Sequence, residues 1–69
     1  MILVSNDQTR IINFDNVTDF YIGPDGCTIK VDFKGGGGCQ LCKYSSPDYT
    51  KSTMKLFIES IGNTGCFKF

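Results

Sequence analysis

The sequence contains no histidine, and this absence narrows the functions open to it. Histidine is the usual general base near neutral pH and the commonest metal ligand. Glu59 is the sole glutamate, and the aspartates lie mostly at predicted turns, helix caps and strand faces. Nucleophilic catalysis needs a base held beside the nucleophile, and no such pair is evident. The sequence therefore predicts a protein that is not an enzyme, with no catalytic residues and no cofactor.

The chain also has no excess of positive or negative charge, because seven lysines and arginines balance seven acidic residues. These charged residues are scattered, with no run of residues of the same charge. Nucleic-acid binders usually carry a basic patch, and mimics of DNA are strongly acidic, so neither class is favoured. No window approaches the roughly 20 apolar residues of a membrane span. The apolar start Met1–Val4 is too short for a secretion signal and lacks a basic flank. We expect a cytoplasmic protein without membrane or direct nucleic-acid partners.

The length of 69 residues predicts a single domain, residues 1–69. A chain this short buries only about 60% of the surface that its unfolded form exposes, so its core is marginal. Tryptophan is absent, and nine phenylalanines and tyrosines supply the large apolar side chains. Stability can then depend on self-association, a ligand or a partner, and a homo-oligomer is one of the states that we consider.

Alternation of apolar and polar residues over 27–34 is the clearest strand signal. The turn Gly23–Gly26 precedes it, with Pro24 and Gly26 suited to the two corners. Gly35–Gly38 follows and is expected to close a hairpin. The remaining strands are expected at residues 1–5, 10–14, 17–22 and 39–44.

A helix is predicted after Ser46, which can cap it, with Pro47 at its first position and Gly62 as its stop. Since the connections are short, we expect an α+β fold: a five-stranded antiparallel β-meander, one C-terminal α-helix packed on one face, and a short edge strand that residues 66–69 can add. The core is expected to comprise Ile2, Val4, Ile12, Phe14, Phe20, Ile22, Ile29, Val31, Phe33, Leu41, Met54, Phe57, Ile58 and Ile61.

Four cysteines, Cys27, Cys39, Cys42 and Cys66, raise the question of a zinc site, since a Cys-X-X-Cys pair is the usual half-site. Only one such pair is present. In the predicted hairpin Cys39 lies near Phe33 at the loop end, and Cys27 lies at the far end, roughly 20 Å away by strand rise. We therefore expect reduced, unpaired thiols and no metal. A redox pair is not favoured either, because such pairs sit at a helix N-terminus.

The glycine run Gly35–Gly38 could cradle a phosphate through backbone N–H groups, but it lacks the P-loop spacing. Two interpretations stay open for it. It is either a flexible hairpin tip or a mobile loop that closes on a ligand or partner.

Two stretches of the chain carry a resemblance. The opening Met1–Asp7 leads to Asn13–Val17, and Leu41-Cys42-Lys43-Tyr44 leads to a helix that ends in Leu56–Ile61. This pattern resembles a group of small uncharacterised proteins from Gram-positive bacteria and their phages. That group favours Gln where this chain has Asn6 and Gly where it has Cys42, so Cys39–Cys42 is not a metal motif common to the group. The resemblance implies a fold and an origin in a mobile element, without implying an activity.

Two functions follow as hypotheses. The first is a small non-catalytic interaction protein that binds a host protein, as a phage anti-defence inhibitor of the anti-CRISPR kind would in the host cytoplasm. The alternative is an oligomeric sponge that sequesters a nucleotide signalling molecule, with Lys43 among its cations. Tyrosines gathered on one surface are typical interface anchors, while ordinary packing at sheet edges is the other explanation for apolar residues off the core faces. Lysines near a glycine loop suit phosphates. The expected partner-binding residues are Tyr21, Lys30, Lys34, Gly35, Gly36, Gly37, Gly38, Tyr44, Tyr49 and Leu56.

Overall fold

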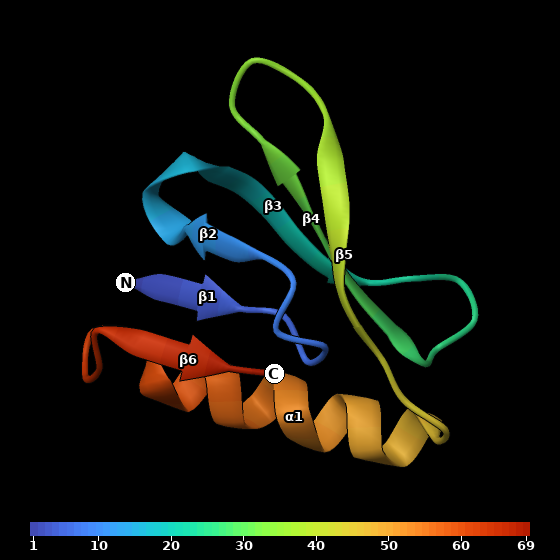
Figure 1. Ribbon diagram of the computed structural model, residues 1–69. Helices are drawn as coiled ribbons and strands as arrows, with labels where there is room; N and C mark the ends of the chain where they lie inside the picture. The colour runs from blue at the N-terminus through green and yellow to red at the C-terminus, as the bar shows by residue number, and fades with distance from the viewer.

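Two three-stranded sheets and one helix form the α+β fold of the computed structural model, which describes residues 1–69 (Figure 1). No helix has the length and apolar character needed to cross a membrane. In chain order the elements are β1 (Ile2–Val4), β2 (Ile11–Asn13), the 3-10 turn η1 (Phe14–Asn16), β3 (Val17–Ile22), β4 (Thr28–Phe33), β5 (Gly38–Lys43), α1 (Pro47–Ser60) and β6 (Cys66–Lys68).

The division into two sheets shows that the predicted single five-stranded meander is wrong. One sheet has the order β2-β1-β6, and the other has the order β3-β4-β5. The chain leaves the first sheet at η1, where the side chain of Asn13 accepts a hydrogen bond from the N–H of Asp15 at 3.0 Å. This local turn separates β2 from β3, so the two strands do not pair. The final strand at residues 66–68 is present and pairs in parallel with β1.

The helix begins as its capping residues predict. The N–H of Tyr49 donates to Oγ of Ser46 at 3.1 Å, and Pro47 occupies the first helical position. The helix ends at Ser60, and Gly62 follows with a φ of 84°, which favours glycine. Figure 1 shows α1 lying along one side of the molecule beside β6, so the sheet of β1 is close to the helix.

The β4–β5 hairpin is shorter at its tip than the sequence suggests. Positive φ values occur at Gly35, Gly36 and Gly37, while Gly38 already belongs to β5 and pairs with Asp32. Cys39 therefore lies opposite Val31 rather than near Phe33, which corrects the predicted register. The reason is that only the three glycines with positive φ form the turn, so the strand β5 begins one residue earlier than expected.

A β-bulge shifts the register further along β5. Ile29 pairs with Cys42, whereas the next residue, Lys30, pairs with Gln40, so Leu41 is the extra residue. Both Leu41 and Cys42 are consequently buried, although they are neighbours in a strand. Burial raises the pKa of the Cys42 thiol above its ordinary value.

The core surrounds Phe57, which projects from α1 and is 2% exposed. Its ring stacks on Phe20 at a centroid distance of 4.3 Å and meets Phe14 edge-on at 5.4 Å. Phe67 of β6 and the following Phe69 complete the cluster at 5.3 and 5.6 Å. Strands of both sheets thus share one aromatic core. The buried apolar residues are Leu3, Ile12, Ile29, Val31, Leu41, Cys42 and Phe57.

Three residues expected in the core are instead exposed: Ile2, Ile58 and Ile61. In β1 the inward residue is Leu3, which pairs with Ile12 and Phe67, so Ile2 points to the other face. On α1 the buried residues are Thr50, Thr53 and Phe57, which turns Ile58 away from the sheets. Ile61 lies beyond the helix, where the backbone is extended.

Candidate functional site

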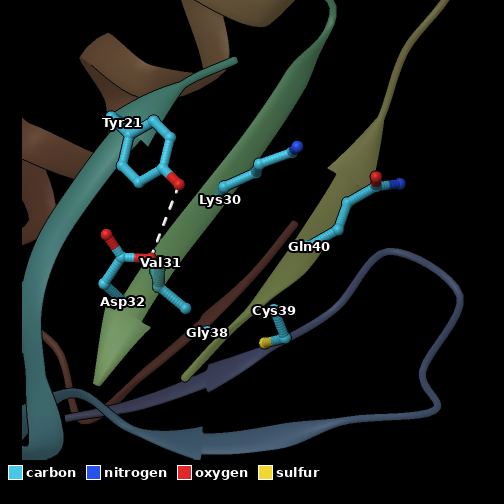
Figure 2. A pocket seen from close by; sticks show the side chains of 7 residues that line it. All are labelled: Tyr21, Lys30, Val31, Asp32, Gly38, Cys39 and Gln40. Atoms are coloured by element: carbon cyan, nitrogen blue, oxygen red, sulfur yellow. Dashed lines mark hydrogen bonds between the residues drawn. The ribbon is translucent and has the colours of Figure 1, made fainter. Parts of the chain in front are cut away.

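The outer face of the β3-β4-β5 sheet is the candidate functional site. The inner face of this sheet holds Ile29 and Val31, so alternate residues of the three strands point outward. Across the middle of this outer face, Tyr21 pairs with Lys30, and Lys30 pairs with Gln40. Figure 2 shows these three side chains side by side on neighbouring strands.

A second row of residues lies beside this one. Asp19 of β3 is opposite Asp32 of β4, and Asp32 is opposite Gly38 of β5. The Tyr21 hydroxyl donates to Oδ1 of Asp32 at 3.5 Å, the dashed line of Figure 2. Burial raises the pKa of Tyr21, and the nearby carboxylates of Asp32 and Asp19 raise it further. The phenol therefore stays protonated and acts as a hydrogen-bond donor at neutral pH.

Residues of both rows line a shallow groove with a volume of about 300 Å³, and Asp19 lies outside the lining, opposite Asp32. Its floor is formed in part by Gly38, where a side chain cannot fit. A Cβ atom at Gly38 would overlap the carbonyl oxygen of Val31 and would lie 2.7 Å from Oδ1 of Asp32. The glycine thus keeps the backbone of β5 accessible between the aspartate and Gln40. The groove offers a phenol, an ammonium group, a carboxylate and an amide for polar contacts.

The sequence-predicted site residues do not all meet in this groove. Tyr21, Lys30 and Gly38 line it. Lys34 lines a different groove, beside β2, and the glycines of the hairpin tip, 35–37, are exposed. Lys30 and Lys34 therefore belong to separate surfaces and do not form one phosphate site.

The other predicted residues lie around the helix. The ring of Tyr44 meets that of Tyr49 edge-on at 4.7 Å, and Tyr49 and Leu56 are each about 60% exposed. Tyr44 is half-buried, and burial raises the pKa of its hydroxyl well above the ordinary range, with a hydrogen bond to Cys42 adding to this effect. Tyr44 is therefore fixed in the fold, while Tyr49 and Leu56 offer separate exposed apolar contacts.

Asp19, Asp32 and Gln40 belong to the groove or its rim, and sequence reasoning did not select them. The strict alternation of β4 places Asp32 on the same face as Lys30, so this signal was available. Alternation along β5 predicts that Gln40 points outward only if counting starts from the hairpin, because the bulge at Leu41 interrupts the pattern. The opposition of Asp19 and Asp32 depends on a second bulge, at Thr18 of β3, and could not be predicted from spacing.

The cysteines lie at separate places in the fold. Cys39 is opposite Val31, and Cys66 is exposed on β6 of the other sheet. The carbonyl of Cys27 accepts a hydrogen bond from the N–H of Tyr44 at 2.8 Å, near the end of β5 away from the hairpin tip. The four thiols are free, and no three metal-ligating side chains are grouped together.

Comparison of the chain with protein-family models, curated proteins and solved structures finds no match. The resemblance to small phage and Gram-positive proteins therefore stays a prediction.

Proposed function

We propose that this protein is a small, non-catalytic interaction protein that binds a partner protein through the outer face of its β3-β4-β5 sheet. The observation that carries the proposal is the polar groove on that face, where Tyr21, Lys30 and Gln40 lie side by side on three strands. A tyrosine held by a hydrogen bond loses little freedom on binding, which is why tyrosines are frequent interface anchors.

The facing carboxylates indicate what the partner presents. Asp19 and Asp32 are directly opposite on adjacent strands, and like charges in that position destabilise a sheet. A guanidinium or ammonium group from a partner would relieve this repulsion and bond to both carboxylates. The partner surface is therefore proposed to carry a basic side chain that enters the groove between β3 and β4.

A narrower proposal concerns the partner's identity. The resemblance to small phage proteins motivates a role as an anti-defence inhibitor that binds a host defence protein in the host cytoplasm. The exposed tip of the β4–β5 hairpin, with Gly35, Gly36 and Gly37, would then contribute adaptable backbone contacts at the rim of the interface.

The test is capture of proteins from a Gram-positive host lysate on the immobilised chain. The wild-type protein is expected to retain a specific host protein, and Asp19→Lys is expected to lose it, because the added ammonium group would repel the basic side chain of the partner and pair with Asp32 in its place. Glu59→Lys provides the matched control, since it makes the same change in charge at an exposed site on α1. Retention of no host protein, or equal loss with both variants, would contradict the proposal.

Asp19→Asn separates binding from stability. Removing one of two facing charges is expected to raise the free energy of unfolding by about 0.2–1 kcal/mol while weakening capture of the partner. Urea unfolding measures the first effect, and titration with the captured protein measures the second. If the variant is both less stable and equally competent in binding, the proposed role of the aspartate pair is wrong.

Calorimetry against cyclic nucleotides and ADP-ribose derivatives tests the alternative of a nucleotide sponge. Lys30 and Lys34 line different grooves, so we expect no heat of binding. Tight binding of any of these compounds, together with a symmetric oligomer in solution, would replace the interaction proposal with the sponge.

A further inference from the structure

The outer edge of β2 carries backbone groups that no neighbouring strand uses. The N–H of Ser5 donates to the carbonyl of Arg10 at 3.1 Å, and the N–H of Phe14 donates to that of Met1 at 3.0 Å. In an antiparallel ladder the hydrogen-bonded pairs alternate with non-bonded ones. Ile11 lies in a non-bonded pair with Val4.

Asn13 lies in the next non-bonded pair, with Ile2. The N–H groups of Ile11 and Asn13 and the carbonyl of Ile11 therefore point away from β1. Because β2 is the last strand of its sheet, these groups face outward.

A groove of about 480 Å³ runs beside this edge. Ile11, Ile12 and Asn13 form one wall. Asn16 and Phe33, with Lys34, form the other, where the N–H of Lys34 donates to the carbonyl of Asn16 at 2.9 Å. The groove is thus the opening between the two sheets, with an unpaired strand edge on one side.

The chemistry of the groove selects its occupant. Apolar surface comes from Phe33 and from Ile11, whose side chain is 74% exposed. Lys34 is the only charged residue that lines the groove. An extended segment that adds to the edge would alternate its side chains, with one set facing the apolar walls.

We propose that this edge is a second docking site, which takes an extended, acidic peptide segment of a partner protein as an additional strand beside β2. Main-chain hydrogen bonds to Ile11 and Asn13 would hold the segment, and a Glu or Asp side chain would pair with Lys34. The strand edge belongs to the other sheet, and its groove shares no lining residue with the groove of Tyr21 and Lys30, so the two sites can be tested separately.

Selection from a displayed library of short linear peptides supplies the probe. Selected peptides are expected to alternate apolar residues and to contain Glu or Asp. On addition of the synthetic peptide, the amide signals of Ile11 and Asn13 should shift and become protected from hydrogen exchange. Peptides without this pattern, or binding that leaves both amides unchanged, would overturn the proposal.

A matched pair of variants tests the edge itself. Asn13→Pro removes the outward N–H, and the φ of −80° at this residue suits proline. Asn13→Ala keeps the N–H but, like proline, loses the side-chain bond to the N–H of Asp15. Asn13→Pro is expected to weaken peptide binding by about tenfold relative to Asn13→Ala. Equal affinities of the two variants would contradict the added strand.

Charge reversal gives a test that does not require a proline. Lys34→Glu should weaken binding of the acidic peptide severalfold, whereas Lys68→Glu, at an exposed position of β6, should leave it unchanged. Sedimentation of the protein without peptide measures whether it self-associates. A dimer that Asn13→Pro dissociates would overturn the proposal by assigning the edge to a second copy of the chain.

Discussion

Asp7 shows how one side chain organises the connection between β1 and β2. Its Oδ1 atom accepts hydrogen bonds from the hydroxyls of Ser5 at 2.6 Å and Thr9 at 2.7 Å, and from the N–H of Thr9 at 3.0 Å. These bonds hold a turn in which Gln8 has a φ of 62°, an unusual value for a residue with a side chain. The carboxylate thus stabilises a backbone conformation that the sequence alone does not favour.

The same hydrogen bonds lower the pKa of Asp7 from 3.8 to about 2, with the Ser5 hydroxyl as the largest cause. A lowered folded-state pKa means that the ionised carboxylate contributes stability above the unfolded value, near 3.8. That contribution is lost as pH falls from about 3.8 to about 2. NMR titration of the side-chain carboxyl should give the low pKa directly.

Thr9→Val is expected to move the pKa of Asp7 toward 3.8, because it removes one hydroxyl donor. The thermal midpoint of the variant should then depend less on pH in this range than that of the wild type. An unchanged titration of Asp7 in Thr9→Val would show that the threonine hydroxyl does not stabilise the charge.

At the scale of single elements, the sequence predicted correctly the features that neighbouring residues determine, such as a helix start or a strand. The Ser46-Pro47 start of α1 and the strand β4 appear in the structure as expected. The alternation of β4 is confirmed except at Thr28, which lies on the polar face and is nevertheless buried. The inward face of β1 was mispredicted, because Ile2, Leu3 and Val4 are all apolar and carry no alternation.

The candidate site follows the same division. Tyr21 was selected because it lies off the core face of its strand, and Lys30 because it is near the glycines. The two side chains lie side by side on one face. The sequence did not predict that Lys34 and Lys30 would line different grooves. Lys34 borders the groove between the two sheets, and the split into two sheets was not expected. The bulge at Leu41 has no signature in spacing, since an extra residue in a strand shows only through its pairing partner.

The glycines of the β4–β5 hairpin allow a prediction about this element. Gly38→Ala places a methyl group against the carbonyl of Val31 and the carboxylate of Asp32, so β5 must move. We expect it to lower the free energy of unfolding by about 1–3 kcal/mol. Gly65→Ala is the control, since a Cβ atom there meets nothing within 4 Å and its φ is not positive.

Urea unfolding of the two alanine variants measures the difference. Gly38→Ala should also perturb the groove, which the amide signals of Lys30 and Gln40 would report. Equal stability of Gly38→Ala and Gly65→Ala would show that β5 adjusts to the added methyl group at little cost.

The whole molecule depends on contacts between segments that are far apart in the chain. β6 pairs with β1, and its Phe67 packs on Phe57 of α1 with the ring centroids 5.3 Å apart. Neither the parallel pairing nor the split into two sheets leaves a local pattern in the sequence, which is why a single meander was expected. The two sheets remain one folding unit because Leu3, from one sheet, and Val31, from the other, belong to the same buried cluster.

Phe57→Ala tests this shared core. Loss of a buried phenylalanine costs about 3–5 kcal/mol, and a chain of 69 residues has a total stability of about 3–10 kcal/mol. The variant is therefore expected to be largely unfolded or close to it, whereas Leu56→Ala, one residue earlier and 60% exposed, should change stability by less than about 0.5 kcal/mol.

In the wild type, hydrogen exchange at the amides of Leu3 and Val31 should report one free energy of opening, because both sheets lose Phe57 in the same event. Opening of the β2-β1-β6 sheet at a clearly lower free energy than the β3-β4-β5 sheet would mean that each sheet is stabilised on its own and that the aromatic cluster does not couple them.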